Sequence, residues 1–440
     1  MQVSFLIDYV RNDHVAARKM ILYFVISRFL LSVVFLSLMY LVQLFWFMRA
    51  WRFTGSIRRH RWKILLRSLL ITVVLLMLAT VLTPPFSHSI THRGPVNWVL
   101  SASRLWLLAS FSGSLLVLSV GGVGWLLRLA MHVIPPAQQQ SFDPVRRTFL
   151  RYAAFIAGSI PFMVTAYGFA SERLRYSIEK VEVPIANLPS TLDGLRIVQL
   201  SDIHIGDFMP RTEIRRAVEI ANELNADLIV LTGDLISYDR DPLGDCIAEL
   251  SRLRAPLGIW GCNGNHEIYT GMEGLAQKLF QRYGMHLLRQ ESAELQWRGG
   301  KINLIGVDYQ GGRRSSGEHP LMLPDIEFLV RKDIPNILLS HNPNTFYRAA
   351  ALGIELSLAG HTHGGQVRIE IVDHQWSPAL FVTKFVAGMY HLPLGAESVA
   401  TVSSAKAATL YVNRGLGTFV MPVRIGVPPE ITLLTLRTMV

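Results

Sequence analysis

Four apolar stretches in the first 170 residues limit what this chain can fold into. They cover residues 29–48, 64–83, 106–127 and 152–170. Each is about 20 residues long, which is the length that an α-helix needs to cross a bilayer. Buried core helices are the alternative, but runs of this length favour an N-terminal bundle of about four transmembrane helices. Pro161 lies inside the fourth stretch, where a membrane helix tolerates it.

The third stretch contains a short glycine run, at Gly121, Gly122 and Gly124. Small residues let two membrane helices approach each other closely. Close helix packing is therefore favoured over the alternative, a nucleotide-binding loop.

Positive charge is concentrated in this apolar part of the chain. Residues 1–170 contain 17 Lys and Arg against 3 Asp and Glu, whereas residues 171–440 contain 26 against 29. A nucleic-acid-binding protein would carry the excess on its folded domain. We therefore expect no nucleic-acid partner, and we interpret the basic residues as a signal of membrane topology.

The loop between the first two stretches, residues 49–63, contains six basic residues and is predicted to be cytoplasmic. Four spans then place the part after residue 171 on the outer side, although a basic N-terminal tail argues against this orientation. The segment RRTFLR at 146–151 resembles a twin-arginine export signal, and an ordinary cytoplasmic arginine pair is the alternative. Both agree with a multi-pass inner-membrane protein whose soluble domain is periplasmic.

A soluble α/β domain is predicted over residues 194–440, after a polar connector at 171–193. Residues 211–225 have the apolar spacing of an amphipathic helix. Short apolar, β-branched runs predict buried strands, and alternation of such strands with helices indicates a layered α/β architecture. The predicted strands are 195–201, 227–233, 257–263, 301–307, 336–342, 354–360, 409–415 and 430–436.

Aspartate, histidine and asparagine follow directly after several of these strands. The carboxyl ends of strands are where α/β sheets build their sites. Carboxylate, imidazole and amide oxygen form a mixed ligand set that suits Mn, Fe or Zn. The candidate ligands are Asp202, His204, Asp234, Asn265, His341, His361 and His363.

Seven ligands are too many for one ion, and with one shared carboxylate they suit two neighbouring metals. The spacing of two in Asp202-x-His204 and His361-x-His363 directs both side chains of each pair to one side of an extended segment. The shared ligand should be an aspartate, and Asp234 is the best placed.

These motifs, in this order, resemble the calcineurin-like metallophosphoesterase superfamily. The tail at 413–436 and the GHTHGGQ segment at 360–366 are similar to its membrane-associated bacterial branch. The resemblance implies an αββα sandwich. It also implies that Asp202, His204 and His363 bind one metal, that Asn265, His341 and His361 bind the other, that Asp234 bridges them, and that His266 faces the leaving group.

The function implied by the resemblance is metal-dependent hydrolysis of phosphate mono- or diesters. Because the domain is anchored beside lipid, a phospholipid or a lipid-linked diphosphate is the expected substrate. The alternative is a membrane sensor or scaffold whose metallophosphoesterase domain binds a ligand without turnover.

Five further features each have two interpretations. Arg414 either contacts phosphate or forms a salt bridge, and Asp207 either binds substrate or is a solvated loop residue. Glu267 either orients His266 or a ligand, or caps a helix. Cys262 is either a nucleophile or, with more weight, a small buried side chain. The GGRR segment at 311–314 is predicted to be a loop that could bind an anionic substrate.

Overall fold

The computed structural model describes residues 30, 33–34, 37–82, 94–131, 136–185, 188–310, 322–371, 374–381, 383–394 and 407–438. The basic N-terminal tail, part of the first apolar stretch and the GGRR segment lie outside these residues. The chain divides into two compact units. The first contains Met1–Thr83 and Ala102–Met163, and the second contains Pro84–Ser101 and Val164–Val440.

Helices account for the first unit. Residues 37–55 are helical, and α2 (His60–Leu82), α3 (Pro95–Met131) and α4 (Pro136–Ala170) follow. Within the described residues, Pro95–Leu129 and Val145–Leu174 are long and apolar enough to cross a membrane. The predicted third and fourth spans therefore coincide with helices of membrane length, and α4 continues through Pro161. A bundle of four spans stays a prediction.

Close packing between α3 and α4 occurs at glycines, but mostly not at those predicted. A Cβ at Gly113 would lie 2.8 Å from the carbonyl oxygen of Gly158, so the two backbones touch. A Cβ at Gly124 would lie 2.8 Å from a leucine methyl group of α4. The prediction is wrong for Gly121 and Gly122, where a Cβ would meet no described atom within 4 Å.

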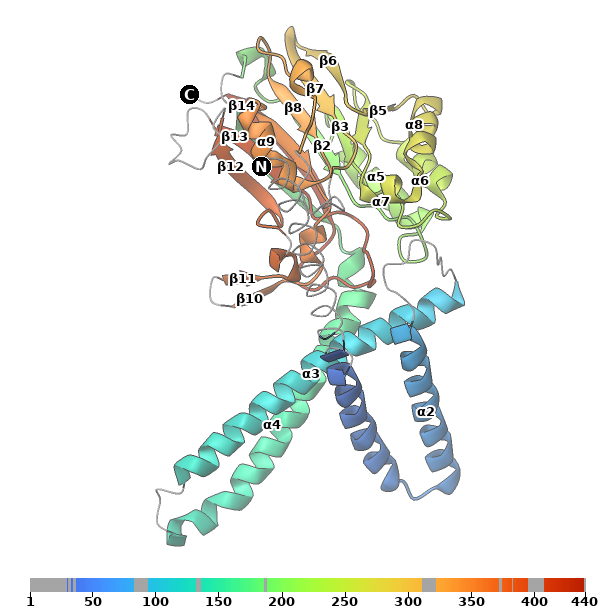
Figure 1. The fold of residues 1–440 in the computed structure, drawn as a ribbon, viewed down its shortest axis with the longest axis vertical. Helices are drawn as coiled ribbons and strands as arrows, with labels where there is room; N and C mark the ends of the chain where they lie inside the picture. The colour runs from blue at the N-terminus through green and yellow to red at the C-terminus, as the bar shows by residue number, and fades with distance from the viewer. Residues whose placement is uncertain are drawn as a thin grey trace, which may run out of the picture. The chain divides into compact units, whose positions relative to one another are not determined.

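Two six-stranded sheets form the second unit (Figure 1). The first, in spatial order, contains β1 (Ser177–Ile185), β14 (Glu430–Thr438), β2 (Arg196–Leu200), β3 (Leu228–Thr232), β4 (Ile259–Cys262) and β5 (His286–Leu287). The second contains β12 (Gly388–Pro393), β13 (Ala407–Val412), β9 (Leu356–Ala359), β8 (Asn336–Leu339), β7 (Gly300–Gly306) and β6 (Glu291–Trp297). A separate hairpin pairs β10 (Ile369–Ile371) with β11 (His374–Trp376).

The central strands of both sheets are parallel. In the first sheet β2, β3, β4 and β5 run parallel, and β14 is antiparallel to β2. In the second sheet β7, β8, β9 and β13 run parallel. Parallel strands present their carboxyl ends at one edge, so loops that follow neighbouring strands come together there.

The two sheets pack face to face around one apolar core, which includes Ile197, Val230, Ile337 and Leu358. The outer face of the first sheet is covered by α5 (Arg211–Glu223), α6 (Leu243–Leu250) and α8 (Glu273–Arg282). The second sheet packs against α9 (Phe346–Ala351), which Figure 1 shows beside β12 and β13. The layers are those of the αββα sandwich that the family resemblance implies.

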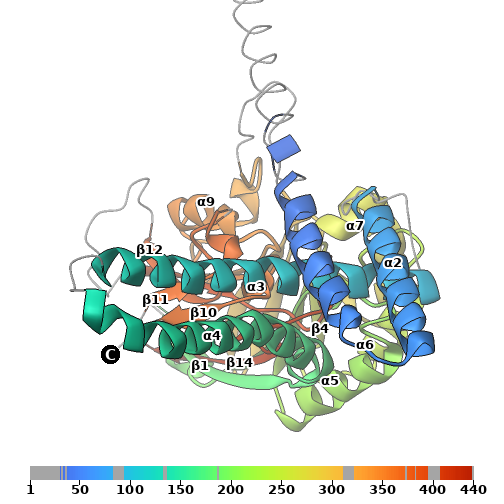
Figure 2. The same ribbon diagram turned by 90° about the horizontal axis from the view of Figure 1, so that it is seen from below.

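The segment interpreted as a polar connector contains an ordered strand. β1 pairs with β14 in parallel register from Ser177 opposite Glu430 to Ile185 opposite Thr438, and Figure 2 shows the two strands side by side. Val183 and Ile185 are buried, whereas the preceding residues alternate between half-buried and exposed. A strand at the edge of a sheet can keep one face in water, and its charged residues hid it in the sequence.

Candidate metal centre

The predicted ligands lie in loops at the carboxyl ends of five strands. Asp202 and His204 follow β2, Asp234 follows β3, and Asn265 begins α7 (Asn265–Thr270) after β4. His341 follows β8, and His361 and His363 follow β9. Both sheets therefore supply ligands, and the candidate centre lies where their carboxyl ends meet.

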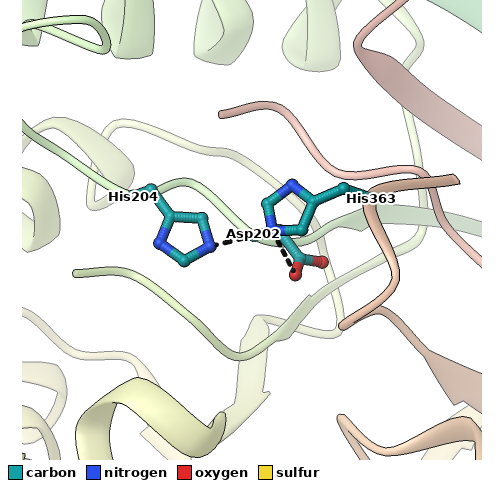
Figure 3. Close-up of side chains that lie close together, drawn as sticks. All are labelled: Asp202, His204 and His363. Atoms are coloured by element: carbon teal, nitrogen blue, oxygen red, sulfur yellow. Dashed lines mark hydrogen bonds and ion pairs between the residues drawn. The ribbon is translucent and has the colours of Figure 1, made fainter. Parts of the chain in front are cut away.

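The first group of ligand atoms comes from Asp202, His204 and His363, which point toward one another in Figure 3. Nε2 of His204 is 3.0 Å from Nε2 of His363. Nε2 of His363 is 3.4 Å from Oδ1 of Asp202. Nδ1 of His204 is 2.9 Å from the Ser237 hydroxyl, which leaves Nε2 for the site.

The second group comes from Asp234, His341 and His361. Nε2 of His341 is 3.0 Å from Oδ2 of Asp234. Nδ1 of His341 donates to the carbonyl oxygen of Thr232 at 2.5 Å, so its Nε2 faces the carboxylate. The rings of His341 and His361 pack edge to face, with centroids 5.1 Å apart.

Asp234 lies between the two groups. Besides its contact with His341, its Oδ2 is 3.7 Å from Nε2 of His204 in the first group. Its Oδ1 accepts the backbone N–H of His266 at 3.0 Å, which docks the first turn of α7 beside it. This is the position that a bridging carboxylate needs.

The backbone at the ligands is unusual. Five of the candidate ligands have positive φ: Asp202 (49°), His204 (50°), Asp234 (55°), His361 (75°) and His363 (53°). Such angles are uncommon for residues other than glycine, and they gather at functional sites. The left-handed backbone turns each side chain inward from a strand that has just ended.

Gly264 and Gly360 leave the space that the two aspartates fill. A Cβ at Gly360 would lie 2.3 Å from Oδ2 of Asp202, and one at Gly264 would lie 2.1 Å from Oδ1 of Asp234. No side chain fits at either position without moving the carboxylate. The glycines of these motifs are therefore required by the ligands beside them.

Glu267 fixes the loop that carries Asp234. Its buried carboxylate accepts the backbone N–H groups of Asp234 (2.9 Å), Leu235 (2.8 Å), Ile236 (3.3 Å) and Gly264 (2.8 Å). The hydrogen bond with Gly264 also caps α7. Both sequence interpretations thus describe part of its role, because Glu267 caps a helix and fixes a ligand loop.

Burial and the two aspartates set the protonation of the histidines. Burial lowers the pKa of His204 to about 3 and that of His361 to about 3, so both are neutral, which is the form that binds a metal. Burial also disfavours a charge on His341, but the Asp234 and Asp202 carboxylates prevail and raise its pKa to about 10. His341 must therefore release a proton to become a ligand.

The donor set fits two divalent cations. Oδ1 of Asn265 is buried and has no hydrogen-bond partner among the described residues, which is costly unless a cation or donor reaches it. Imidazole nitrogens and carboxylate oxygens converge in two groups, with Asp234 common to both sides. Mn, Fe and Zn accept this mixture of ligands. The assignment of each ligand to one metal stays a prediction.

His266, the predicted acid, lies beside this centre without belonging to either group of three described above. A ring nitrogen of His266, a ring nitrogen of His204 and a carboxylate oxygen of Asp234 all lie within 4.8 Å of one another. Nδ1 of His266 donates to the carbonyl oxygen of Ser237 at 2.8 Å, which fixes the orientation of the ring. Ser237 thereby fixes two rings, since its hydroxyl contacts His204.

Arg414 forms a salt bridge, which was the second of its two interpretations. Its guanidinium pairs with the carboxylates of Glu430 and Glu179, and only 9% of the residue is exposed. These two carboxylates accept hydrogen bonds from the guanidinium, so the structure supports the salt bridge and not the phosphate contact. Cys262 is buried, and burial raises the pKa of its thiol, which does not suit a nucleophile.

Asp207 follows neither of its two interpretations. Its Oδ2 accepts hydrogen bonds from the backbone N–H of Gly94 and from Nδ2 of Asn97, each at 2.9 Å. Gly94 directly precedes α3, and Asn97 lies in its first turn. The loop that follows the first metal-binding motif is therefore tied to the end of a helix of membrane length.

Two aromatic residues that belong to none of the sequence motifs border the site. The ring of Phe419 packs on His204 and His266, with centroid distances of 5.6 and 4.5 Å. The ring of Tyr309 lies 5.3 Å from that of His361. Tyr309 follows β7, another strand of the second sheet, and this position is a signal that could have identified it. Phe419 has no comparable signal.

Comparison with known proteins agrees with this geometry. A profile of the calcineurin-like phosphoesterase family matches residues 195–365. The chain is 30% identical over 307 residues to a Bos taurus transmembrane protein with metallophosphoesterase domain, covering 68% of this chain and 65% of that protein. A Danio rerio protein of the same description is 30% identical over 289 residues, covering 62% and 60%.

A bacterial relative is covered almost completely. The uncharacterized metallophosphoesterase YkuE of Bacillus subtilis is 30% identical over 307 residues, covering 67% of this chain and 98% of that protein. The chain spans less than two thirds of the length of the two animal relatives.

Proposed function

We propose a function from one premise: the chain belongs to the calcineurin-like metallophosphoesterase family. Its domain is that of a hydrolase of phosphate esters, and its clustered Asp and His side chains are candidate metal ligands. The observation that carries the proposal is the position of Asp234 Oδ2, which is 3.0 Å from His341 and 3.7 Å from His204. One carboxylate thus joins two sets of ligands.

The proposed reaction is hydrolysis of a phosphate mono- or diester with two divalent ions, Mn, Zn or Fe. Such ions lower the pKa of water and neutralise phosphoryl oxygens. Asp202, His204 and His363 would hold one ion, Asn265, His341 and His361 would hold the other, and Asp234 would be shared. The buried, neutral imidazoles are ready to coordinate without first losing a proton, His341 excepted.

His266 is the proposed general acid. Its Nδ1 donates to the Ser237 carbonyl, which fixes the orientation of the ring. Nε2 can then donate a proton to the departing oxygen of the ester. A general acid of this kind contributes about 10²–10⁴ in rate.

A lipid-borne phosphate ester is the proposed substrate class. The ends of α3 and α4 belong to the same compact unit as the metal centre. At one side, Asn97 of α3 donates to Asp207, three residues after His204. At the other, the backbone of Gly168 in α4 contacts Arg424, five residues after Phe419. Loops that border the site thus rest on helix ends, which supports a phospholipid or lipid-linked diphosphate as substrate.

We further propose that the protein is a multi-pass protein of the inner membrane with the domain on the periplasmic side. Two apolar helices and relatives described as transmembrane proteins support association with a membrane. The orientation rests on the six basic residues at 49–63.

The test is metal analysis of the full-length protein in detergent micelles, followed by a hydrolysis screen. The substrates are p-nitrophenyl phosphate, bis-p-nitrophenyl phosphate, a phospholipid and a lipid-linked diphosphate. We expect about two metals per chain and turnover that His266→Ala lowers most on poor leaving groups. Metal binding without hydrolysis of any of them would favour the sensor alternative.

A further inference from the structure

Phe419 packs directly on the proposed acid. Its ring centroid is 4.5 Å from that of His266, with the rings 68° apart. It is 5.6 Å from that of His204, with the rings 22° apart. The two histidine rings are themselves 4.9 Å apart. The three rings form one cluster. Phe419 is its apolar member, since its ring has no nitrogen with which to bind a metal or transfer a proton.

Gln366 fixes the backbone of Phe419 with both ends of its amide. Its Oε1 accepts the N–H of Phe419 at 2.7 Å, and its Nε2 donates to the carbonyl oxygen of Phe419 at 2.9 Å. Gln366 comes directly after the short 3-10 helix His363–Gly365 and has a φ of 56°. The segment that carries two metal ligands therefore also determines the place of Phe419.

The loop that carries Phe419 is anchored on the first metal-binding motif as well. The N–H of Gly417 donates to the carbonyl oxygen of Asp202 at 2.7 Å. The fully buried guanidinium of Arg424 donates twice to the carbonyl oxygen of Gly417, at 2.6 and 3.1 Å. Hydrogen bonds to Gly417 therefore fix the loop two residues before Phe419.

We infer that Phe419, placed by Gln366, is a positioning residue for His266, an inference that rests on the proposed function. The Ser237 carbonyl fixes Nδ1 of His266, and the packed ring of Phe419 keeps the imidazole from turning about its side-chain bonds. Together they direct Nε2 to the place of the leaving group.

The consequence is selectivity by leaving group. p-Nitrophenolate departs without a proton, whereas phenolate and alkoxides depend on the acid. A wrongly placed His266 therefore slows poor leaving groups most. We expect Phe419→Leu to lower kcat/KM at least about tenfold on the phenyl ester and less than about threefold on the p-nitrophenyl ester. The metal content should stay that of the wild type.

The experiment uses the full-length protein in detergent micelles and the class of ester, mono- or diester, that the wild type hydrolyses. Kinetics on matched phenyl and p-nitrophenyl esters are measured with metal content for Phe419→Leu, Phe419→Tyr and Gln366→Met. Phe419→Tyr keeps the ring and should restore most activity on the phenyl ester, and Gln366→Met should resemble Phe419→Leu. Phe328→Leu is the control, because Phe328 is 77% exposed in the short 3-10 helix Glu327–Leu329.

Equal losses on the two esters, or a loss of metal that follows the loss of activity, would overturn this inference alone. In that case Phe419 would support the metal centre and not the acid. Failure of Phe419→Tyr to recover phenyl ester hydrolysis would also overturn it. A wild type inactive on both esters, with its metals bound, would overturn the proposed function and this inference with it.

Discussion

Replacing Glu267 by glutamine tests whether backbone hydrogen bonds, and not the metals, build the candidate centre. The change keeps the size of the side chain and removes its charge. In the wild type Oε2 accepts the N–H groups of Asp234 and Gly264, and Oε1 accepts those of Leu235 and Ile236. A glutamine amide offers one acceptor oxygen, so its NH₂ group must face two buried N–H donors.

The magnitude follows from those two donors. Each buried donor left without an acceptor costs about 1–3 kcal/mol, so Glu267→Gln should destabilise the second unit by about 2–6 kcal/mol. At about 3 °C per kcal/mol for a domain of this size, Tm should fall by about 6–18 °C. The loop of Asp234 should move as well, and we expect metal affinity to fall about 10–100-fold, as when supporting residues of metal sites are lost.

The assay is thermal unfolding of the full-length protein in detergent, followed by near-UV circular dichroism, together with metal analysis. Glu223→Gln is the matched control, because Glu223 is exposed near the end of α5. The reasoning is refuted if Glu267→Gln unfolds within about 2 °C of the wild type and binds metal equally well.

Three other perturbations have definite expected outcomes. Gly360→Ala should reduce metal affinity at least about tenfold, because the added Cβ would lie 2.3 Å from Oδ2 of Asp202. Gly274→Ala is the control, because its added Cβ would meet no described atom within 4 Å. Equal metal titrations of the two variants would contradict this steric argument. Chelation of the metals should abolish hydrolysis and lower Tm. A metal that binds only the folded state stabilises that state, by about 2.7 kcal/mol at a free concentration of 100 times Kd. An unchanged Tm and rate after verified metal removal would contradict this expectation. Hydrogen bonds from Arg215 and Arg211 lower the pKa of Glu249 to about 2 from its usual 4.5, so the stabilisation it gives is complete above about pH 4.5 and is lost as pH falls toward 2. The Tm difference between wild type and Glu249→Gln should therefore narrow over that range, and a constant difference would count against it.

The sequence predicts the central strands and the clustering of the candidate metal ligands for the same reason. Strands β2, β3, β8 and β9 are buried on both faces, so they are short continuous apolar runs. A polar residue directly after such a run marks the carboxyl end of the strand. The side chains of the candidate centre could therefore be located without knowledge of which strands pair.

The remaining features depend on contacts between distant parts of the chain. β1 is an edge strand with one exposed face, so its charges resemble those of a linker. Asp207 finds its partner Asn97 across 110 residues, and Arg414 finds Glu179 across 235. No local pattern records these partners. The clamp of Gln366 on Phe419 is of the same kind, since neither residue type has a special role until the fold brings the two together.

Hydrogen bonds within the chain hold the strained backbone at the candidate ligands. Five ligands adopt positive φ, each at a cost of order 1–3 kcal/mol, and such angles persist only where the surroundings enforce them. Here they are enforced: Glu267 fixes the N–H of Asp234, and the Asp202 carboxylate accepts the N–H of His361 at 3.0 Å. One ligand thus fixes the backbone of another across the two sheets. Metals that bind this centre would enter a site whose geometry these hydrogen bonds already set. Metal removal should therefore lower the stability of the fold without moving the candidate ligands apart.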